Sequence, residues 1–366
     1  MAIRTALVIG GGIGGLSTAI ALAQNGVETR VVERRRDALA GPGAVVVREP
    51  FLRAMGALGT LEPVCGAGFA YRGVRLLDAE GYVCEEIAGG PSAQTPYPGQ
   101  LSLARPALTQ ILCARALSLG VDFKYAMSFE DIAQTPDEAV VTLSDGSRAS
   151  YDLVVGADGK DSLVRHMMFG GAHRPRFTGV GVWRCDVPRP SKLDWAEIYM
   201  GRDNDRAGYV PITGTSMFVF AVTSEPDNPT FARDALADAF RSRLEGYGGL
   251  LAELRDEEIS CASRVMYHPL EACLVPGPWY HGRVVLIGDA AHCVTSHLAQ
   301  GATMAVGDAV ALADSLERFP EIADALAAFM SARLDATTRS VAAGLPQAWP
   351  AAPRDAHGVS PPPSRN

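Results

Sequence analysis

The sequence lacks several patterns that would place it in a familiar class at once. It contains no Cys-x-x-Cys pair, and its seven cysteines (positions 65, 84, 113, 185, 261, 273 and 293) are odd in number and scattered. Such a set argues against a disulfide framework and a structural zinc site, so we expect no bound metal. No apolar run reaches membrane-spanning length and no signal peptide is visible, which predicts a cytoplasmic protein without membrane contact.

A basic stripe is also missing. The formal net charge of −8 argues against general nucleic-acid binding, and the cluster Arg34-Arg35-Arg36 is too short to change that. Arg34 is instead expected to contact the cofactor. The chain has 366 residues, of which 48% are hydrophobic and 20% charged. These values are ordinary for a soluble enzyme with two domains or one large one.

What stands out is the stretch from Ala6 to Leu16, ALVIGGGIGGL. Its apolar beginning predicts a buried parallel strand, and Gly10, Gly12 and Gly15 follow with the spacing of a dinucleotide-binding turn. Gly10 permits the tight turn, Gly12 lets the backbone approach a pyrophosphate, and Gly15 lets helix and strand pack closely.

The residues after this turn extend the pattern. A helix rich in Ala, Leu and Ile is predicted over 16–24, so the turn that also holds Ile13 and Gly14 would present free N–H groups to phosphates. A second strand, 28–33, ends in Glu33, placed to accept hydrogen bonds from a ribose. The alternative, a glycine-rich turn without a ligand, is the less favoured interpretation.

Farther along, helical patterns and β-rich patterns interleave. Helices are predicted over 50–58, 101–119, 227–254, 301–316 and 320–343. The segments typical of a dinucleotide-binding domain recur at 1–70, 100–178 and 262–345. The β-rich segments 71–99 and 179–261 are most simply one inserted domain with a largely antiparallel sheet, and the Pro-rich tail 347–366 is predicted to be disordered.

Two further motifs join the first. One is GADGKDSLVR, Gly156 to Arg165, after an apolar strand. The other is GRVVLIGDAAH, Gly282 to His292, continued by LAQGA at 298–302. Asp289 follows a buried strand, the edge at which doubly wound folds bind ligands, and a helix begins near Gly301.

The three motifs together resemble the single-component FAD-dependent aromatic monooxygenases, whose type member is para-hydroxybenzoate hydroxylase. The resemblance runs from residue 3 to about 335 and implies a Rossmann-like FAD-binding domain with an inserted substrate domain. It also implies tightly but non-covalently bound FAD, with Gly288 and Asp289 at the ribitol, Arg105 at the phosphate-ribitol region and Asp158 at both FAD and NAD(P)H. Each of these residues also has an alternative interpretation without a ligand. Asp289 would then be a helix cap, Asp158 part of an Asp-Gly turn and Arg105 a surface arginine near a helix start.

The same resemblance carries a mechanism. NAD(P)H, a transient co-substrate without a glycine fingerprint of its own, reduces the flavin. O2 then forms a C4a-hydroperoxide, which hydroxylates a small aromatic or heteroaromatic substrate. Backbone N–H groups of Gly301 and Ala302, at a helix N-terminus, would stabilise the anionic reduced flavin. The sequence leaves the choice between monomer and homodimer open.

The substrate-binding residues are harder to predict. Tyr209 is the first candidate for a substrate base, and Ser296 and His297 stand in the loop after the third motif, where the family usually has Pro in place of Ser296. Arg165 is expected to support its loop through ion pairs and His292 to be structural. Other candidates for the pocket wall are Trp183, Arg184, Tyr199, Phe218 and Phe220.

Other flavoprotein activities share this fold. A flavin-dependent halogenase would carry Trp-x-Trp-x-Ile-Pro, but the segment Trp183 to Pro188 lacks the second Trp, which disfavours halogenation. A reductase of the geranylgeranyl-reductase type and a non-catalytic flavin-binding protein are the remaining alternatives. Arg105, Asp158 and Asp289 argue against the last of these.

Overall fold

The computed structural model describes residues 3–36, 43–90, 97–201, 205–260, 264–294 and 300–345. The chain divides into two compact units. Unit 1 comprises Met1–Gly68, Leu103–Arg176 and Glu271–Leu345, and unit 2 comprises Phe69–Ser102 and Phe177–Leu270. In the described part of the chain, no helix has an apolar stretch long enough to cross a membrane.

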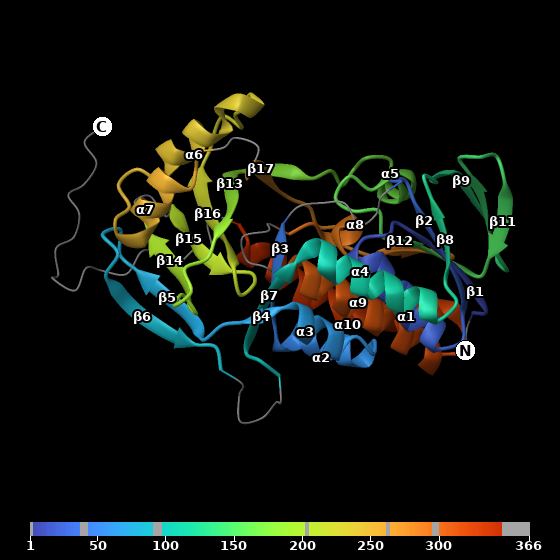
Figure 1. Ribbon diagram of the computed structural model, residues 1–366. Coiled ribbons are helices and arrows are strands. Elements are labelled where there is room, and N and C mark those ends of the chain that lie inside the picture. The colour runs from blue at the N-terminus through green and yellow to red at the C-terminus, as the bar shows by residue number, and fades with distance from the viewer. Residues whose placement is uncertain are drawn as a thin grey trace. The chain divides into compact units, whose positions relative to one another are not determined.

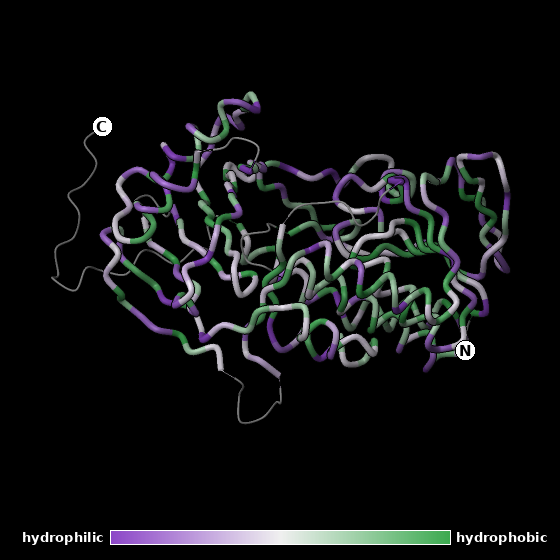
Figure 2. Tube along the Cα trace, viewed as in Figure 1, coloured by the Kyte–Doolittle hydropathy of each residue, from purple (hydrophilic) through white to green (hydrophobic). Residues whose placement is uncertain are grey.

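Unit 1 is built on a six-stranded sheet. In spatial order its strands are β18 (Tyr280–His281), β19 (Val284–Leu286), β12 (Leu153–Gly156), β1 (Thr5–Ile9), β2 (Glu28–Glu33) and β8 (Asp122–Tyr125). Strands β19 to β8 run parallel, and β18 is antiparallel at the edge. The central strands are buried almost throughout, which explains why they have continuous apolar sequences (Figure 2).

Helices cover this sheet. Figure 1 shows α1, α4, α9 and α10 gathered on one side of it. The helices of unit 1 are α1 (Ile13–Gln24), α2 (Glu49–Ala57), α3 (Leu61–Ala67), α4 (Arg105–Ser118), α5 (Leu163–Phe169), α8 (Asp289–His292), α9 (Gly301–Arg318) and α10 (Ile322–Ala343). A separate antiparallel sheet consists of β9 (Phe129–Gln134), β10 (Ala139–Leu143) and β11 (Arg148–Tyr151).

Unit 2 is built on a seven-stranded sheet in which β5 and β14 are a parallel pair inside a mainly antiparallel order. Its strands are, in spatial order, β17 (Val265–Ala272), β13 (Arg176–Pro188), β16 (Ser216–Ser224), β15 (Arg206–Pro211), β14 (Ala196–Met200), β5 (Gly73–Leu77) and β6 (Val83–Ala88). Its α-helices are α6 (Leu236–Arg243) and α7 (Gly249–Glu257). The remaining strands are β3 (Ala44–Arg48), β4 (Phe69–Ala70) and β7 (Gln100–Ala104).

The two faces of the unit 2 sheet differ because side chains alternate along each strand. One face carries Trp183, Tyr199 and Tyr209, which pack with Phe240 of α6 and Leu251 of α7 in a single buried cluster. The Trp183 ring stacks on Phe240 with centroids 5.9 Å apart. The core of unit 2 therefore lies between this face and helices α6 and α7.

Two predicted helices differ from the structure. The helix expected over 101–119 begins only at Arg105, because residues 100–104 form strand β7, whose first four residues are buried. The helix expected over 227–254 is broken between α6 and α7, where Gly246 adopts a left-handed conformation (φ +86°) that a helix interior does not tolerate. The predicted strand-helix-strand unit over residues 6–33 matches the structure closely.

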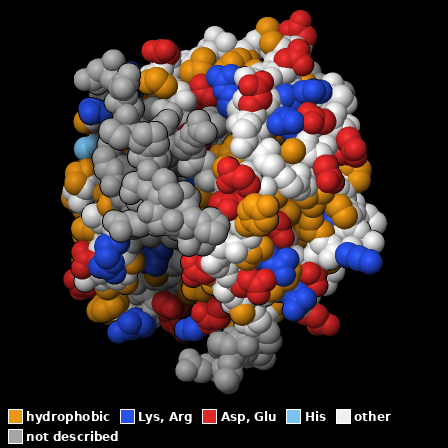
Figure 3. Space-filling view, turned by 90° about the vertical axis from the view of Figure 1, so that its left-hand side faces the viewer, with side chains coloured by type: hydrophobic (Ala, Val, Ile, Leu, Met, Phe, Trp, Pro, Cys, Tyr) orange, Lys and Arg blue, Asp and Glu red, His pale blue; other side chains and the backbone are white. Residues whose placement is uncertain are grey.

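The surface shows the charge balance of the sequence. On the face drawn in Figure 3, acidic and basic side chains are interspersed rather than segregated. A protein that tracks a nucleic-acid backbone would gather its Lys and Arg side chains into one stripe. This face shows no such stripe.

A buried carboxylate supports the core of unit 2. Glu225, 5% exposed, accepts hydrogen bonds from Trp183 Nε1 (3.3 Å), Thr223 Oγ1 (2.9 Å) and Arg243 Nε (3.1 Å). Burial alone would raise the pKa of Glu225, but the hydrogen bonds from Arg243 and Thr223 outweigh it and the pKa is lowered. The carboxylate is therefore charged at neutral pH.

We expect Glu225→Ala to lower the free energy of unfolding by about 2–3 kcal/mol, because it leaves the Arg243 cation without its carboxylate partner and removes one of the two acceptors of the Trp183 N–H, the other being Thr223 Oγ1. This is below the range for fully buried pairs, since the Arg243 side chain is 30% exposed. Chemical denaturation measures it. Glu85→Ala, on the exposed strand β6, is the matched control and should change little. Equal effects of the two substitutions would contradict the proposed role.

Candidate functional site

The three sequence motifs meet at one edge of the unit 1 sheet. Ile9 at the end of β1 lies opposite Gly156 of β12, and Gly156 lies opposite Leu286 of β19. The turns that follow these neighbouring strands carry Gly10, Asp158 and Asp289. The carboxyl edge of a doubly wound sheet is where such folds bind ligands.

Close backbone contacts explain the glycines of the first turn. A Cβ added to Gly10 would lie 2.3 Å from the Ala157 carbonyl oxygen, and one added to Gly15 would lie 1.9 Å from the Gly10 carbonyl oxygen. Gly12 is different, because a Cβ there would meet nothing within 4 Å. Gly12 is the N-cap of α1 and no side chain caps that helix, so the N–H groups of Ile13 and Gly14 face a space that an anion can fill.

Beside this helix N-terminus lies a cavity of about 180 Å³. Of the predicted cofactor-binding residues, it is lined by Gly10, Gly12, Glu33, Arg34 and Asp158. The Glu33 carboxylate is held in place because Oε2 accepts a hydrogen bond from Gly11 N and Oε1 one from Arg35 N, each 2.8 Å long. Each oxygen retains a further lone pair for a sugar hydroxyl.

The cavity wall also includes residues that sequence reasoning missed. Met127 and Ser128 follow β8, which lies beside β2, and Met127 N donates to the Glu33 carbonyl (3.0 Å). Asp161 and Leu163 come from the second motif. Met127 and Ser128 reach the cavity because they follow strand 122–125, which pairs with β2. The sequence alone does not show that this short strand is a parallel neighbour of β2.

The structure gives Asp158 a local role. Its carboxylate accepts hydrogen bonds from Ser162 Oγ, Leu163 N (2.7 Å) and Val164 N (3.2 Å), at the start of α5. Burial nevertheless raises the pKa of Asp158. These bonds favour the interpretation of Asp158 as a residue that shapes the turn, while its position in the cavity wall keeps cofactor contact open as a proposal.

A second group of predicted residues surrounds Asp289. A Cβ added to Gly301, the first residue of α9, would lie 4.0 Å from Asp289 Oδ1, so this carboxyl lies at the N-terminus of α9 together with Ala302. Asp289 reaches solvent on one side but is enclosed on the others, and this burial raises its pKa, while His292, Arg105 and Arg165 oppose the rise. Among the described residues, none donates a hydrogen bond to its carboxylate. Arg105, the exposed first residue of α4, is a nearby cation.

Arg165 connects the second and third motifs. We expected ion pairs, but its buried guanidinium instead donates to backbone carbonyls: those of His173 (2.7 Å), Lys160, Ala290 (3.0 Å) and Asp289 (3.4 Å). Carbonyl groups in a loop or in a short helix have few backbone N–H donors within reach. The guanidinium of Arg165 supplies them with N–H donors in a fixed geometry. Arg165 is therefore a structural bridge.

The candidates for substrate contact are divided between the two faces of the unit 2 sheet. Tyr209 is 1% exposed in the core beneath α6 and α7, its hydroxyl donates to Glu197, and burial together with this bond raises its pKa. This placement does not fit a substrate base, which must be reachable and titrate near neutrality. Trp183 and Tyr199 share the covered face and are likewise core residues.

The opposite face carries the other predicted wall residues. Arg184 lies over the Phe218 ring, 3.5 Å from its centroid, and pairs across the sheet with Phe220. Burial lowers the pKa of Arg184 to about 10. Ser296 and His297 lie outside the described residues.

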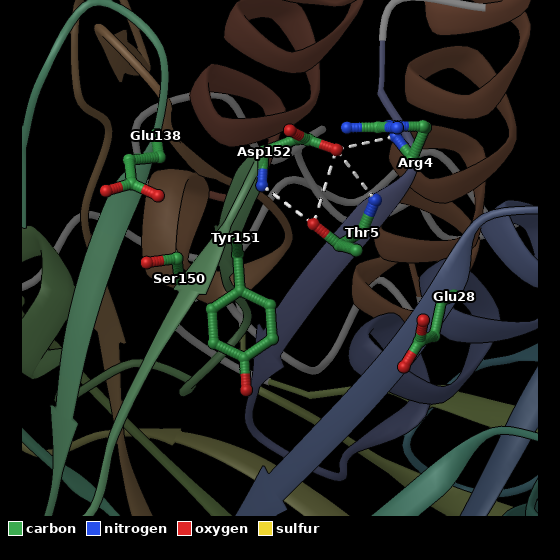
Figure 4. Close-up of a pocket in the computed structure, with 7 residues that line it drawn as sticks. All are labelled: Arg4, Thr5, Glu28, Glu138, Ser150, Tyr151 and Asp152. Atoms are coloured by element: carbon green, nitrogen blue, oxygen red, sulfur yellow. Dashed lines mark hydrogen bonds between the residues drawn. The ribbon is translucent and has the colours of Figure 1, made fainter.

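A larger depression of about 390 Å³ lies at the other end of the same strands (Figure 4). It is lined by Thr5, the first residue of β1, and by Asp152, whose Oδ2 accepts from Arg4 N (2.7 Å) and Thr5 N (2.9 Å). Since Gly10 follows the last residue of β1, this polar depression is separate from the glycine turn. Of its three carboxylates, the one of Asp152 is already used to join the starts of β1 and β12.

A parallel sheet with a glycine turn, an acidic residue at the end of the second strand and a distant aspartate at the same edge is typical of a dinucleotide-binding protein. The chain belongs to the family described as "FAD binding domain", whose sequence profile matches residues 4–324. This confirms the expected class, the flavoprotein monooxygenases of the para-hydroxybenzoate hydroxylase-like group, and FAD as the cofactor.

The chain is similar to two curated proteins and to one solved structure. Aurachin C monooxygenase/isomerase of Stigmatella aurantiaca is 31% identical over 92% of this chain and 87% of its own. The 3-hydroxybenzoate 6-hydroxylase of Klebsiella oxytoca is 28% identical over 93% of this chain and 86% of its own. The solved structure of HpxO from Klebsiella pneumoniae, complexed with FAD and uric acid, has a TM-score of 0.85 at 24% identity, covering 94% and 88% of the two chains. The last comparison confirms the predicted fold.

The glycine turn offers a matched pair of substitutions. We expect Gly12→Ala to leave the free energy of unfolding of the FAD-free protein almost unchanged but to weaken FAD binding, because the new methyl group enters open space where phosphates would bind. Gly15→Ala should instead destabilise the fold by about 2 kcal/mol or more, since its methyl overlaps the Gly10 carbonyl. Denaturation and FAD titration separate the two. A Gly12→Ala protein with wild-type FAD affinity would refute the phosphate-binding assignment.

Proposed function

We propose that this flavoprotein uses NAD(P)H and O2 to hydroxylate a small aromatic or heteroaromatic compound. The observation that supports this most is the pairing of two groups at one sheet edge. A cavity lies around Gly12 and Glu33, where the adenine half would bind, and the N-terminus of α9, which has no side-chain cap, lies beside Asp289. When bound, FAD supplies the redox chemistry, accepting a hydride and activating O2 for transfer of one oxygen atom.

The residues of unit 1 fit an extended FAD. Glu33 would accept hydrogen bonds from the ribose, and the N–H groups at the start of α1 would bind the pyrophosphate. Asp289 would accept from the ribitol hydroxyls, with Arg105 near the phosphate-ribitol region. The N–H groups of Gly301 and Ala302 would face the pyrimidine edge, where their partial positive charge favours negative charge on the ring.

The residues of unit 2 would supply the substrate pocket. We assign this role to the sheet face that carries Arg184, Phe218 and Phe220, because the opposite face is filled by the packing of α6 and α7. Flat aromatic walls beside the cations of Arg184 and Arg206, which lie on this same face, suit a planar, electron-rich ring with an anionic group. The phenolic acid and the purine named for two similar proteins are compounds of this kind. The substrate base is a further proposal, for which Ser296 and His297 remain candidates.

The test begins with the purified full-length chain. We expect the visible absorption of bound flavin, and stimulation of NADH or NADPH oxidation in air by one or more members of a panel of phenols, hydroxybenzoates and hydroxypyridines. Product analysis must show one added oxygen atom from O2. If the protein binds FAD but no compound of the panel stimulates NADH or NADPH oxidation or is hydroxylated, the monooxygenase proposal for these substrates is refuted. A product that forms only in the presence of halide would favour a halogenase.

Asp289→Asn tests the ribitol assignment. We expect FAD affinity to fall roughly ten- to a hundredfold, from about 1.5–3 kcal/mol for hydrogen bonds to a charged group. Because burial raises the pKa of Asp289, the charged form is disfavoured in the folded protein, and the substitution should not lower the melting temperature measured without FAD. Asp335→Asn, exposed on α10, is the control. Unchanged FAD affinity in Asp289→Asn would refute the assignment.

A further inference from the structure

A fully buried carboxylate lies on α9 behind the third motif. Asp308 is 0% exposed and lies on the helix face that also buries Ala305 and Ala309. A carboxylate without solvent is strongly unfavourable unless donors surround it. The hydrogen-bond partners of Asp308 therefore indicate its structural role.

Three donors converge on Asp308. Oδ2 accepts hydrogen bonds from the Gly288 backbone N–H (2.8 Å) and pairs with His292 Nε2 (2.5 Å), while Oδ1 accepts from Arg333 Nε (2.7 Å). Burial by itself would raise the pKa of Asp308, but His292 and Arg333 outweigh burial and the pKa is lowered. The carboxylate is thus ionised and engaged on both oxygens.

The two partners of Oδ2 bracket the functional aspartate. Gly288 immediately precedes Asp289 and has a left-handed backbone (φ +55°), and His292 is the last residue of α8, Asp289–His292. A helix of four residues is too short to hold its own conformation. Asp308 therefore ties down both ends of the segment that carries Asp289.

Helix α9 also contacts the first motif. A Cβ added to Gly288 would lie 3.1 Å from the Ala305 Cβ, and one added to Gly14 would lie 3.2 Å from the same atom. Ala305 stands three residues before Asp308, on the same helix face. Asp308 thus projects from a helix whose position is already set against both cofactor turns.

We propose that Asp308 is a positioning residue for the flavin half of the cofactor site, acting through the Gly288 N–H and His292 to hold the Asp289 carboxyl beside the N-terminus of α9. The inference rests on the proposed function, in which Asp289 binds the flavin ribitol. According to this proposal, the affinity for the flavin half of FAD depends on the Asp308 carboxylate, although the cofactor does not contact that residue. The adenine half, at Gly12 and Glu33, does not depend on it.

Asp308→Asn is the direct test, because the amide keeps the shape but places an NH2 group against one of the donors now facing a carboxylate. Full-length holoprotein is compared with the variant in three measurements: FAD dissociation by flavin fluorescence, competition by ADP as a probe of the adenine half, and visible circular dichroism of the bound flavin. We expect FAD affinity to fall about tenfold or more, with ADP affinity changed less than about twofold and an altered flavin spectrum.

A second variant separates positioning from folding. Arg333, on α10, donates to Asp308 Oδ1. Arg333→Gln removes this donor and leaves the contacts of Oδ2 with Gly288 and His292 in place. It should lower the melting temperature while preserving the ratio of FAD to ADP affinity and the flavin spectrum. Asp314→Asn, exposed on the same helix as Asp308, is the control and should change none of these.

Each outcome decides the matter. A selective loss of FAD affinity with Asp308→Asn, not reproduced by Arg333→Gln, supports the proposal. Equal losses of FAD and ADP affinity, or a selective loss equal in both variants, would show a general folding role and overturn it. If Asp308→Asn does not fold, a changed ratio or flavin spectrum in folded Arg333→Gln overturns the proposal, whereas preserved values support it. Failure of the wild-type chain to bind FAD would instead refute the proposed function, and is visible before any variant is made.

Discussion

The close approach of the Gly10 backbone to Ala157 sets the geometry on which the rest of unit 1 depends. These residues follow β1 and β12, which are parallel neighbours, and any side chain at Gly10 would overlap the Ala157 carbonyl. Because the two turns touch, the first helix starts directly above the sheet edge with its N–H groups unpaired. The second strand ends at the same edge, so Glu33 can brace the glycine turn through Gly11. One backbone contact thus brings together the helix end and the carboxylate to which we assign the pyrophosphate and the ribose.

The segment that carries Asp289, to which we assign the flavin half of the cofactor, is held in a different way. Asp289 stands on a helix too short to be stable alone, and its surroundings raise its pKa. Two buried charged side chains hold this short helix in place. Arg165 binds the carbonyls of Asp289 and Ala290, and Asp308 binds the Gly288 N–H and His292. The hydrogen bonds made by these two side chains hold the segment in place, so the Asp289 carboxyl can stay accessible although its own helix is only four residues long.

The two faces of the unit 2 sheet differ in how they are covered. The face with Trp183, Tyr199 and Tyr209 is filled by α6 and α7 and braced by Glu225 and Arg243. The alternate residues, Arg184 and Phe218 among them, are left for other contacts. If the proposed substrate face is correct, its residues can change without disturbing the packing beneath α6 and α7, because the two sets of side chains point to opposite sides of the sheet.

Local patterns were enough to predict the glycine turn, Glu33, the strand before Asp289 and the cofactor, because each depends on residues close in sequence and on a backbone geometry with few solutions. They were not enough for Tyr209, since the period of two along a strand separates its faces without saying which one helices will cover. They also missed Met127 and the buried Asp308. Met127 reaches the cavity only because β8 pairs with β2, and Asp308 matters only because α9 packs behind residue 288. Such roles depend on long-range packing, and packing is a property of the folded chain.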